Sequence, residues 1–304
     1  MNSFIEDFKY AWNKPNNGVA KLIIINVIVW VTLNLIYFFS SISDNMGVFQ
    51  VIYDNIKLQP TFETYIFKPW TIITYFFTHQ DFFHILYNMI FMYWFGKLVQ
   101  EYLGSQKVIG LYVWGGIVGG FAYLIIYYVL GLQSAGMIGA SAGVYAIIVG
   151  AATFKPEHRF HLLFIGPVQL KYLAAIAVLL SFFELTSSNT GGNIAHLGGA
   201  LVGFLFMKQL QKGDDWSIPV TKTLDFFTNL FKPKSDFKVS YGKKSRVSVS
   251  KNNNKTTAPK KDSIPEQAVI DAILDKISEA GYEKLSKEEK QILFKASQQK
   301  KNKL

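Results

Sequence analysis

The sequence predicts an all-α polytopic membrane protein with six transmembrane helices and a small helical segment at its C-terminal end. Two observations predict this fold. No charged residue occurs from Val108 to Phe154, a run of 47 residues. Two membrane spans joined by a short turn explain such a run, whereas soluble elements do not. The density of basic residues also rises after residue 212: residues 1–212 hold 12 of the 31 Lys and Arg, and the shorter remainder holds 19.

The apolar segments mark the expected spans. We expect helices at 22–39, 82–102, 108–130, 141–154, 168–185 and 194–210. The first has no small-residue cleavage site and is too long for the apolar region of a signal peptide, so it is expected to stay uncleaved. Residues 44–80 are mixed in character and indicate a long structured loop that can hold short interfacial helices.

Basic residues predict the orientation. Lys and Arg concentrate in the N-terminus at 1–21, between the second and third spans, between the fourth and fifth, and after the sixth. Because cytoplasmic loops carry the excess of Lys and Arg, both termini are expected in the cytoplasm. The predicted location is the cell (inner) membrane, and the membrane domain is expected at 22–212.

The tail divides into two predicted parts. Residues 213–263 have the composition of a basic flexible linker, which is either a solubilising spacer or a binder of anionic lipid headgroups. Residues 264–304 are predicted to form a helical hairpin, in which Ser286 and Glu289 make a capping box. Two short helices bury too little surface to be stable alone, so we expect them to dock on a partner of unknown identity.

Several chemistries are excluded by what the sequence lacks. The chain has no cysteine, which excludes disulfides, thiol nucleophiles and Cys-ligated metal sites. It contains no Gly-x-Gly-Asp motif and no His-Glu-x-x-His motif, which argues against aspartyl and zinc chemistry within the membrane. We expect no metal and no cofactor.

Four polar residues are predicted to lie at a similar depth, one to two turns below the outer surface. They are His84, Asn88, Ser141 and His196, and each lies near the start of a helix that enters from the external side. Polar groups inside a membrane are costly unless they are paired, so they are candidates for function.

Ser141 lies in the segment Gly139-Ala-Ser-Ala-Gly143. A nucleophile elbow requires a strand before the serine, and here a membrane helix precedes it, so an α/β hydrolase is excluded. A serine at a helix N-terminus can still act as a nucleophile, because unpaired backbone N–H groups there can stabilise an oxyanion. The alternative is a plain helix cap or a small packing residue.

His196 can be a general base, a metal ligand or a structural histidine. Two stripes of small residues favour the first role, because they let the fourth and sixth helices approach closely. The stripes are Ala142, Ala146 and Gly150, and Ala195, Gly199 and Gly203. The close approach is predicted to bring His196 to Ser141, with Tyr145 stacked on the imidazole ring. Asp81 and Glu184 are expected near the outer rim, so a Ser–His dyad is favoured over a triad.

His84 and Asn88 are spaced i, i+4 and share one helix face. This pair suits hydrogen-bond donation to an oxyanion better than metal binding, because Asn is a poor zinc ligand. For His79, five residues upstream, hydrogen bonds that cap the loop are the favoured role.

Taken together, the chain resembles the rhomboid intramembrane serine proteases over about residues 66–210. The resemblance is carried by Trp70, His79, His84-x-x-x-Asn88, Glu101-x-x-Gly104, Gly139-x-Ser141, Tyr145 and Ala195-His196-x-x-Gly199-x-x-x-Gly203. One departure is Thr71, which stands where the family often has arginine.

The resemblance implies Ser141 as nucleophile, His196 as base, and an oxyanion hole formed by His84, Asn88 and the Ser141 N–H. It also implies transmembrane protein substrates within the lipid bilayer and no nucleic acid. The lysine-rich composition and the paired C-terminal helices indicate a bacterial member. The alternative is a catalytically silent rhomboid-like protein that binds membrane clients. Such relatives typically lose the dyad, which this chain retains.

Overall fold

The computed structural model describes residues 2–162, 164–186, 189–230, 267–280, 285–286, 288–289 and 292. The chain divides into two compact units, Met1–Ser235 and Asp236–Leu304. Each unit is described below by itself.

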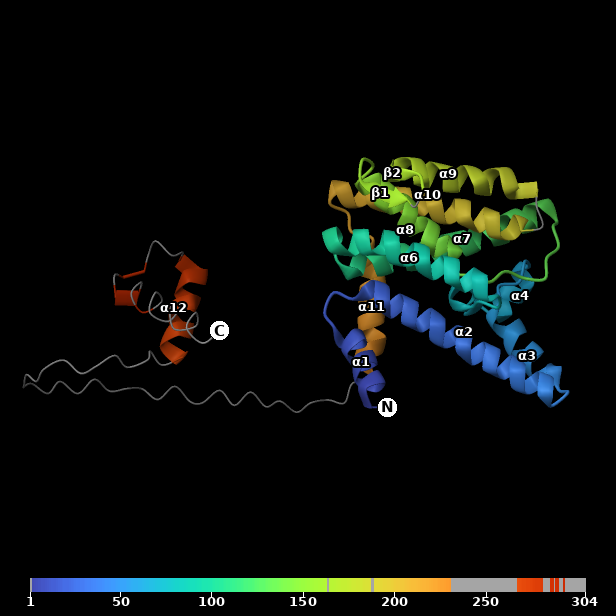
Figure 1. Ribbon diagram of the computed structural model, residues 1–304, viewed down its shortest axis with the longest axis horizontal. Coiled ribbons are helices and arrows are strands. Elements are labelled where there is room, and N and C mark those ends of the chain that lie inside the picture. Colours follow the sequence, from blue (N-terminus) through green and yellow to red (C-terminus); the bar gives the residue numbers. More distant parts are fainter. Residues whose placement is uncertain are drawn as a thin grey trace, which may run out of the picture. The chain divides into compact units, whose positions relative to one another are not determined.

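The first unit is a bundle of α-helices, as predicted. Helices are present at all six expected positions: α2 (Gly18–Ile42), α6 (Phe82–Leu103), α7 (Ser105–Leu130), α8 (Ser141–Phe154), α9 (Leu170–Phe183) and α10 (Thr190–Lys212). In Figure 1, the axes of α6, α9 and α10 lie nearly parallel to one another, and the chain runs along α9 in the opposite sense to α10. By length and composition, α2, α7 and α10 can each cross a membrane, and α8 is a shorter apolar helix. The prediction of an all-α membrane fold is confirmed.

The segments between these helices also contain regular structure. A short helix, α1 (Asn2–Asn13), precedes α2. The predicted loop at 44–80 contains α3 (Met46–Ile56), α4 (Phe62–Phe67), α5 (Thr71–Thr74) and the 3₁₀ turn η1 (Tyr75–Phe77). A second 3₁₀ turn, η2 (Glu184–Thr186), follows α9. A hairpin of β1 (Arg159–Leu162) and β2 (Gly166–Gln169) connects α8 to α9, so α9 begins two residues later than predicted.

The centre of the unit is a contact of α7, α8 and α10 that small residues make possible. A Cβ built on Gly199 or Gly203 of α10 would collide with the backbone carbonyl of Ala142 or Ala146 of α8. On α7, a Cβ on Gly119 would lie 2.6 Å from the Ala142 Cβ. These helices therefore pack backbone to backbone, which small residues allow and which requires glycine at positions 199 and 203. The enclosed position of α8 also explains how a helix of 14 residues, about 21 Å long, serves at the core of a membrane domain.

The predicted flexible linker at 213–263 is wrong for its first part, because residues Ser217–Leu230 form helix α11. In Figure 1, α11 crosses the direction of the bundle helices. Apolar residues recur at Val220, Leu224 and Phe227, which is helical spacing. The composition of the whole segment is polar, so an interpretation from composition alone did not reveal this helix. Residues 231–263 lie outside the described residues.

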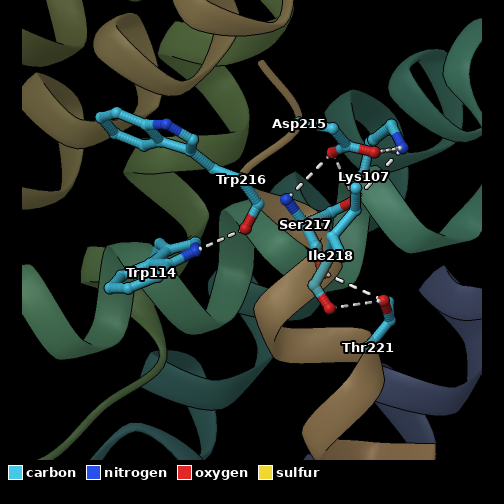
Figure 2. A network of polar contacts seen from close by, with 7 residues as sticks. All are labelled: Lys107, Trp114, Asp215, Trp216, Ser217, Ile218 and Thr221. Carbon is cyan, nitrogen blue, oxygen red and sulfur yellow. Dashed lines mark hydrogen bonds and ion pairs between the residues drawn. The ribbon is translucent and has the colours of Figure 1, made fainter.

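A polar network holds the start of α11 on α7 (Figure 2). The Asp215 carboxylate accepts hydrogen bonds from the Ser217 N–H (3.0 Å) and hydroxyl (2.6 Å), and forms an ion pair with Lys107 of α7 (2.5 Å). The Trp114 indole N–H donates to the Trp216 carbonyl (2.8 Å). Burial raises the pKa of Asp215, but the hydrogen bonds from Lys107 and Ser217 lower it by more, so this pKa lies below its usual range.

The network predicts a pH-dependent attachment of α11. Since the folded state lowers the Asp215 pKa, the ion pair stabilises the attachment fully above the unfolded pKa of about 3.9. That stabilisation is lost as the pH falls through the folded-state value. At neutral pH, Lys107→Ala is expected to weaken docking by about 1.5–3 kcal/mol, because it removes a hydrogen bond to a charged group. Faster proteolysis within 217–230 would report this. Lys222→Ala, which removes an exposed lysine of α11, is the matched control. Equal proteolysis of the two variants would contradict the anchoring role.

The second unit contains helix α12 (Gln267–Ala280), where a helical hairpin is predicted at 264–304. The Glu289 N–H donates to the Ser286 hydroxyl (3.2 Å), and the Ser286 N–H donates to the Glu289 carboxylate (2.7 Å). The predicted capping box is therefore confirmed. Glu289 also pairs with Lys276 of α12 (2.8 Å). The rest of the second predicted helix lies outside the described residues.

Candidate active site

Ser141 is the first residue of α8, and the turn before it depends on a glycine. Gly139 has φ +124°, a conformation that L side chains rarely adopt, and its N–H donates to the Tyr75 carbonyl (3.0 Å). A Cβ at Gly139 would lie 2.7 Å from the His84 ring. The Gly-x-Ser spacing is therefore a steric requirement, because it lets His84 of α6 approach the start of α8.

His79 fixes the same turn from the other side. Its side chain is buried, and Nε2 accepts a hydrogen bond from the Ala140 N–H (3.2 Å). The Asn88 amide lies 3.5 Å from the same nitrogen. His79 thus connects the segment before α6 to the residue that precedes Ser141. This is the loop-capping arrangement favoured from the sequence.

The structure brings Ser141 and His196 together. The Ser141 Oγ lies 2.7 Å from His196 Nε2, within hydrogen-bond distance. His196 lies in the second turn of α10, which begins at Thr190, four residues earlier than predicted. The contact follows from the register of the two stripes, because Gly199 faces the backbone of Ala142, the neighbour of Ser141. Tyr145 stacks on the imidazole, with ring centroids 4.3 Å apart and an interplanar angle of 8°.

Sequence reasoning missed a third residue at the histidine. Ser181 of α9 is buried, and its Oγ lies 3.0 Å from His196 Nδ1 and 2.8 Å from the Tyr145 hydroxyl. Its one signal in the sequence is a hydroxyl within an apolar helix, where polar groups require partners. No spacing rule connects residue 181 to residue 196.

His84 and Asn88 lie on one face of α6, as their spacing predicts. The Asn88 amide donates to the His84 carbonyl in its own helix (2.9 Å), and the His84 ring lies beside Gly139. Both side chains line a cavity that also contains Tyr145. The Ser141 N–H lies at the start of α8, where backbone donors have no partner within the helix.

This cavity has a volume of about 1020 Å³ and lies among α6, α8, α9 and β1. The walls are mostly aromatic and aliphatic, with Trp94 and Phe95 from α6, Ile176 and Leu180 from α9, and Phe160 from β1. The polar residues that line the cavity are His84, Asn88, Tyr145 and His161. The cavity can therefore hold an apolar chain, and Tyr145, which stacks on His196, lies in its wall.

The loop with the Thr71 departure is anchored without an arginine. The Thr71 hydroxyl donates to the Lys68 carbonyl (2.7 Å), and the Trp70 indole N–H donates to the Asn55 carbonyl (2.7 Å). Thr71 is buried and Trp70 is exposed. These two bonds connect α5 to the segments before it.

A serine hydroxyl bonded to an imidazole is the arrangement used for nucleophilic acyl transfer, with the histidine as general base. Sequence comparisons identify two related families. The Rhomboid domain family matches residues 67–212, and a family of unknown function, DUF6576, matches residues 260–299.

Three individual rhomboid proteins are also similar in sequence to this chain. The mitochondrial RHOMBOID-like protein 12 of Arabidopsis thaliana is 31% identical over 157 residues, which cover 47% of this chain and 47% of that protein. Rhomboid protease GlpG of Haemophilus influenzae is 27% identical over 147 residues, covering 48% and 72%. The putative rhomboid protease YdcA of Bacillus subtilis is 30% identical over 146 residues, covering 47% and 70%. The match thus spans about half the length of the Arabidopsis relative. The chain belongs to the rhomboid family of membrane proteins, which includes intramembrane serine proteases.

Proposed function

We propose that this protein is an intramembrane serine endopeptidase that uses a Ser141–His196 dyad. The observation that carries the proposal is the 2.7 Å contact between Ser141 Oγ and His196 Nε2 inside a membrane helix bundle. The dyad also argues against the catalytically silent alternative, because a protein that only binds clients has no need of it.

In the proposed mechanism, His196 Nε2 takes the Ser141 proton as Oγ attacks the scissile carbonyl carbon. The resulting imidazolium then gives this proton to the leaving amine, and the acyl-enzyme forms. His196 next activates a water molecule that hydrolyses the ester and restores Ser141. Tyr145 holds the imidazole plane by stacking, so that Nε2 stays directed at Ser141.

The oxyanion of the tetrahedral intermediate requires hydrogen-bond donors. We assign this role to the Ser141 N–H and to the side chains of His84 and Asn88. The Gly139 turn brings the His84 ring to the start of α8, and the helix N-terminus adds unpaired N–H donors there. Gly199 and Gly203 support the site by holding α10 against α8.

The substrate class follows from the cavity beside the dyad. Its apolar walls suit a transmembrane segment, and its polar side chains suit the peptide groups that such a segment exposes when it unwinds. We expect single-span substrates whose helices unwind easily near the outer face, with small residues at the cut. The excess of Lys and Arg supports the proposal that both termini lie in the cytoplasm and that the site lies toward the external side of the cell membrane.

The proposed domain organisation is a cytoplasmic N-terminus at 1–21, the rhomboid membrane domain at 22–212, a linker that begins with α11, and a C-terminal helical unit. On α12, Ile273 is buried, but the apolar side chains of Val269 and Leu274 are exposed. We assign the C-terminal unit to the binding of a partner.

Purified protein reconstituted in vesicles with a single-span substrate is expected to release two fragments by cleavage in or near the span. A soluble protein that carries the same residues around the cut is the control and is expected to stay intact. Binding of a panel of single-span proteins without cleavage of any would contradict the proposal and indicate the client-binding alternative.

Asn88→Ala tests the assigned oxyanion hole. We expect kcat to fall by about 10²–10³ with little change in KM, because a donor to the oxyanion acts in the transition state. His84→Ala is expected to act similarly. Steady-state cleavage of the single-span substrate measures both constants. A higher KM with normal kcat would instead assign both residues to substrate binding.

A further inference from the structure

A buried hydroxyl from α9 completes the surroundings of the histidine. The buried residues of α9 are Leu170, Ala174 and Ser181, and Ser181 is 2% exposed. On the same helix, Leu180 and Phe182 are more than half exposed. Ser181 is thus directed inward, and the two residues that its hydroxyl contacts, His196 and Tyr145, belong to the proposed active site.

We propose that Ser181 is a positioning residue that sets the tautomer and orientation of His196. The inference rests on the proposed protease function and deepens it. The contact joins Ser181 Oγ to His196 Nδ1, the ring nitrogen opposite the one that faces Ser141. In serine–histidine–aspartate enzymes a carboxylate occupies this position. Here a neutral hydroxyl occupies it.

The direction of the hydrogen bonds supports the assignment. The Tyr145 hydroxyl donates to the Ala177 carbonyl (3.3 Å), and a carbonyl oxygen can only accept. Tyr145 can therefore accept from the Ser181 hydroxyl (2.8 Å), which leaves the Ser181 oxygen to accept from His196 Nδ1–H. With its proton on Nδ1, the imidazole has a lone pair on Nε2, which accepts the Ser141 proton.

The same hydrogen bond also stabilises the state that follows proton transfer. When His196 has taken the Ser141 proton, its Nδ1–H carries part of a positive charge and bonds more strongly to the Ser181 oxygen. The bond is therefore stronger after proton transfer than before it, which is the condition for lowering a barrier. A neutral hydroxyl gives less stabilisation than a carboxylate, so its loss should reduce activity without abolishing it.

Three variants of Ser181 separate this role from simple packing. Ser181→Ala is expected to lower kcat by about 10- to 100-fold with little change in KM, the range for a hydrogen bond to a charged group. Ser181→Cys keeps the volume but hydrogen-bonds weakly, so its kcat should stay near that of the alanine variant. Ser181→Thr keeps the hydroxyl and should recover most of the activity. Ser40→Ala, at a buried serine of α2, is the matched control and should behave as wild type.

Coupling to Tyr145 tests the chain of hydrogen bonds. Tyr145→Phe keeps the stacked ring but removes the hydroxyl that accepts from Ser181, and is expected to lower kcat by about 3- to 10-fold. Added to Ser181→Ala, it should cause no further loss, because both changes break one chain. Additive losses would contradict the chain.

The outcomes distinguish failure of the positioning role of Ser181 from failure of the proposed protease function. If wild type cleaves, Ser141→Ala does not, and Ser181→Ala keeps full kcat, the positioning role is overturned and the dyad stands. Full activity in Ser181→Cys together with loss in Ser181→Ala would also overturn it, because volume alone would explain the result. If wild-type protein and Ser141→Ala behave alike, the failure belongs to the proposed protease function.

Discussion

Ser141→Ala is expected to lower the cleavage rate by about 10⁶, the range observed when a serine protease loses its nucleophile. The substitution removes the one oxygen that lies 2.7 Å from His196 Nε2 and leaves the helix intact, since alanine favours helix. Cleavage of a single-span substrate in vesicles by the purified variant measures the effect. The thermal stability of the variant should stay near that of wild type.

His196→Ala is expected to cause a similar loss, and the double variant should be no slower than either single variant. The two residues act as a unit, so once one is removed, removing the other does not lower the rate further. Thr153→Ala is the control on the same helix, because its hydroxyl donates to the Val149 carbonyl within α8 itself. Undiminished activity in Ser141→Ala would end the proposed mechanism.

Gly199→Ala is expected to disrupt the site without touching any reacting group. The added Cβ would collide with the backbone carbonyl of Ala142, which cannot move aside as a flexible side chain can. The helices α8 and α10 must therefore separate, and with them Ser141 and His196. Since a displacement of about 1 Å can cost about 10² in rate, we expect at least that loss of cleavage, together with a lower melting temperature.

Gly150→Ala is the matched comparison, on the opposite stripe. Its added Cβ would lie 3.1 Å from the Leu111 side chain, which can change rotamer. We expect a much smaller loss of both activity and melting temperature. Equal effects of the two substitutions would contradict the backbone-to-backbone packing of α8 on α10.

Much of the bundle and part of the site could be predicted from the sequence, because membrane burial leaves strong local signals. Uncharged runs located the helices, and the two small-residue stripes predicted the approach of Ser141 to His196. A further signal was present and unused. Gly115 and Gly119 have the same i, i+4 spacing, and they bring α7 into the contact of α8 with α10.

The features that were missed depend on contacts between segments distant in sequence. Ser181 is one serine in an apolar helix, and only the packing of α9 against α10 shows that it faces His196. The helix α11 owes its position to Lys107, more than one hundred residues away. The β1–β2 hairpin is too short for its pattern to stand out. Such contacts are set by tertiary packing, which local periodicity does not report.

Covalent labelling with a fluorophosphonate probe tests the central claim most directly, because the probe reacts with a serine only when a base activates it. The labelled protein is digested, and mass spectrometry locates the adduct. We predict a single adduct on Ser141 in the wild-type protein and none in Ser141→Ala or His196→Ala. Undiminished labelling in Ser141→Ala, or an adduct on a different serine of the wild-type protein, would contradict the account.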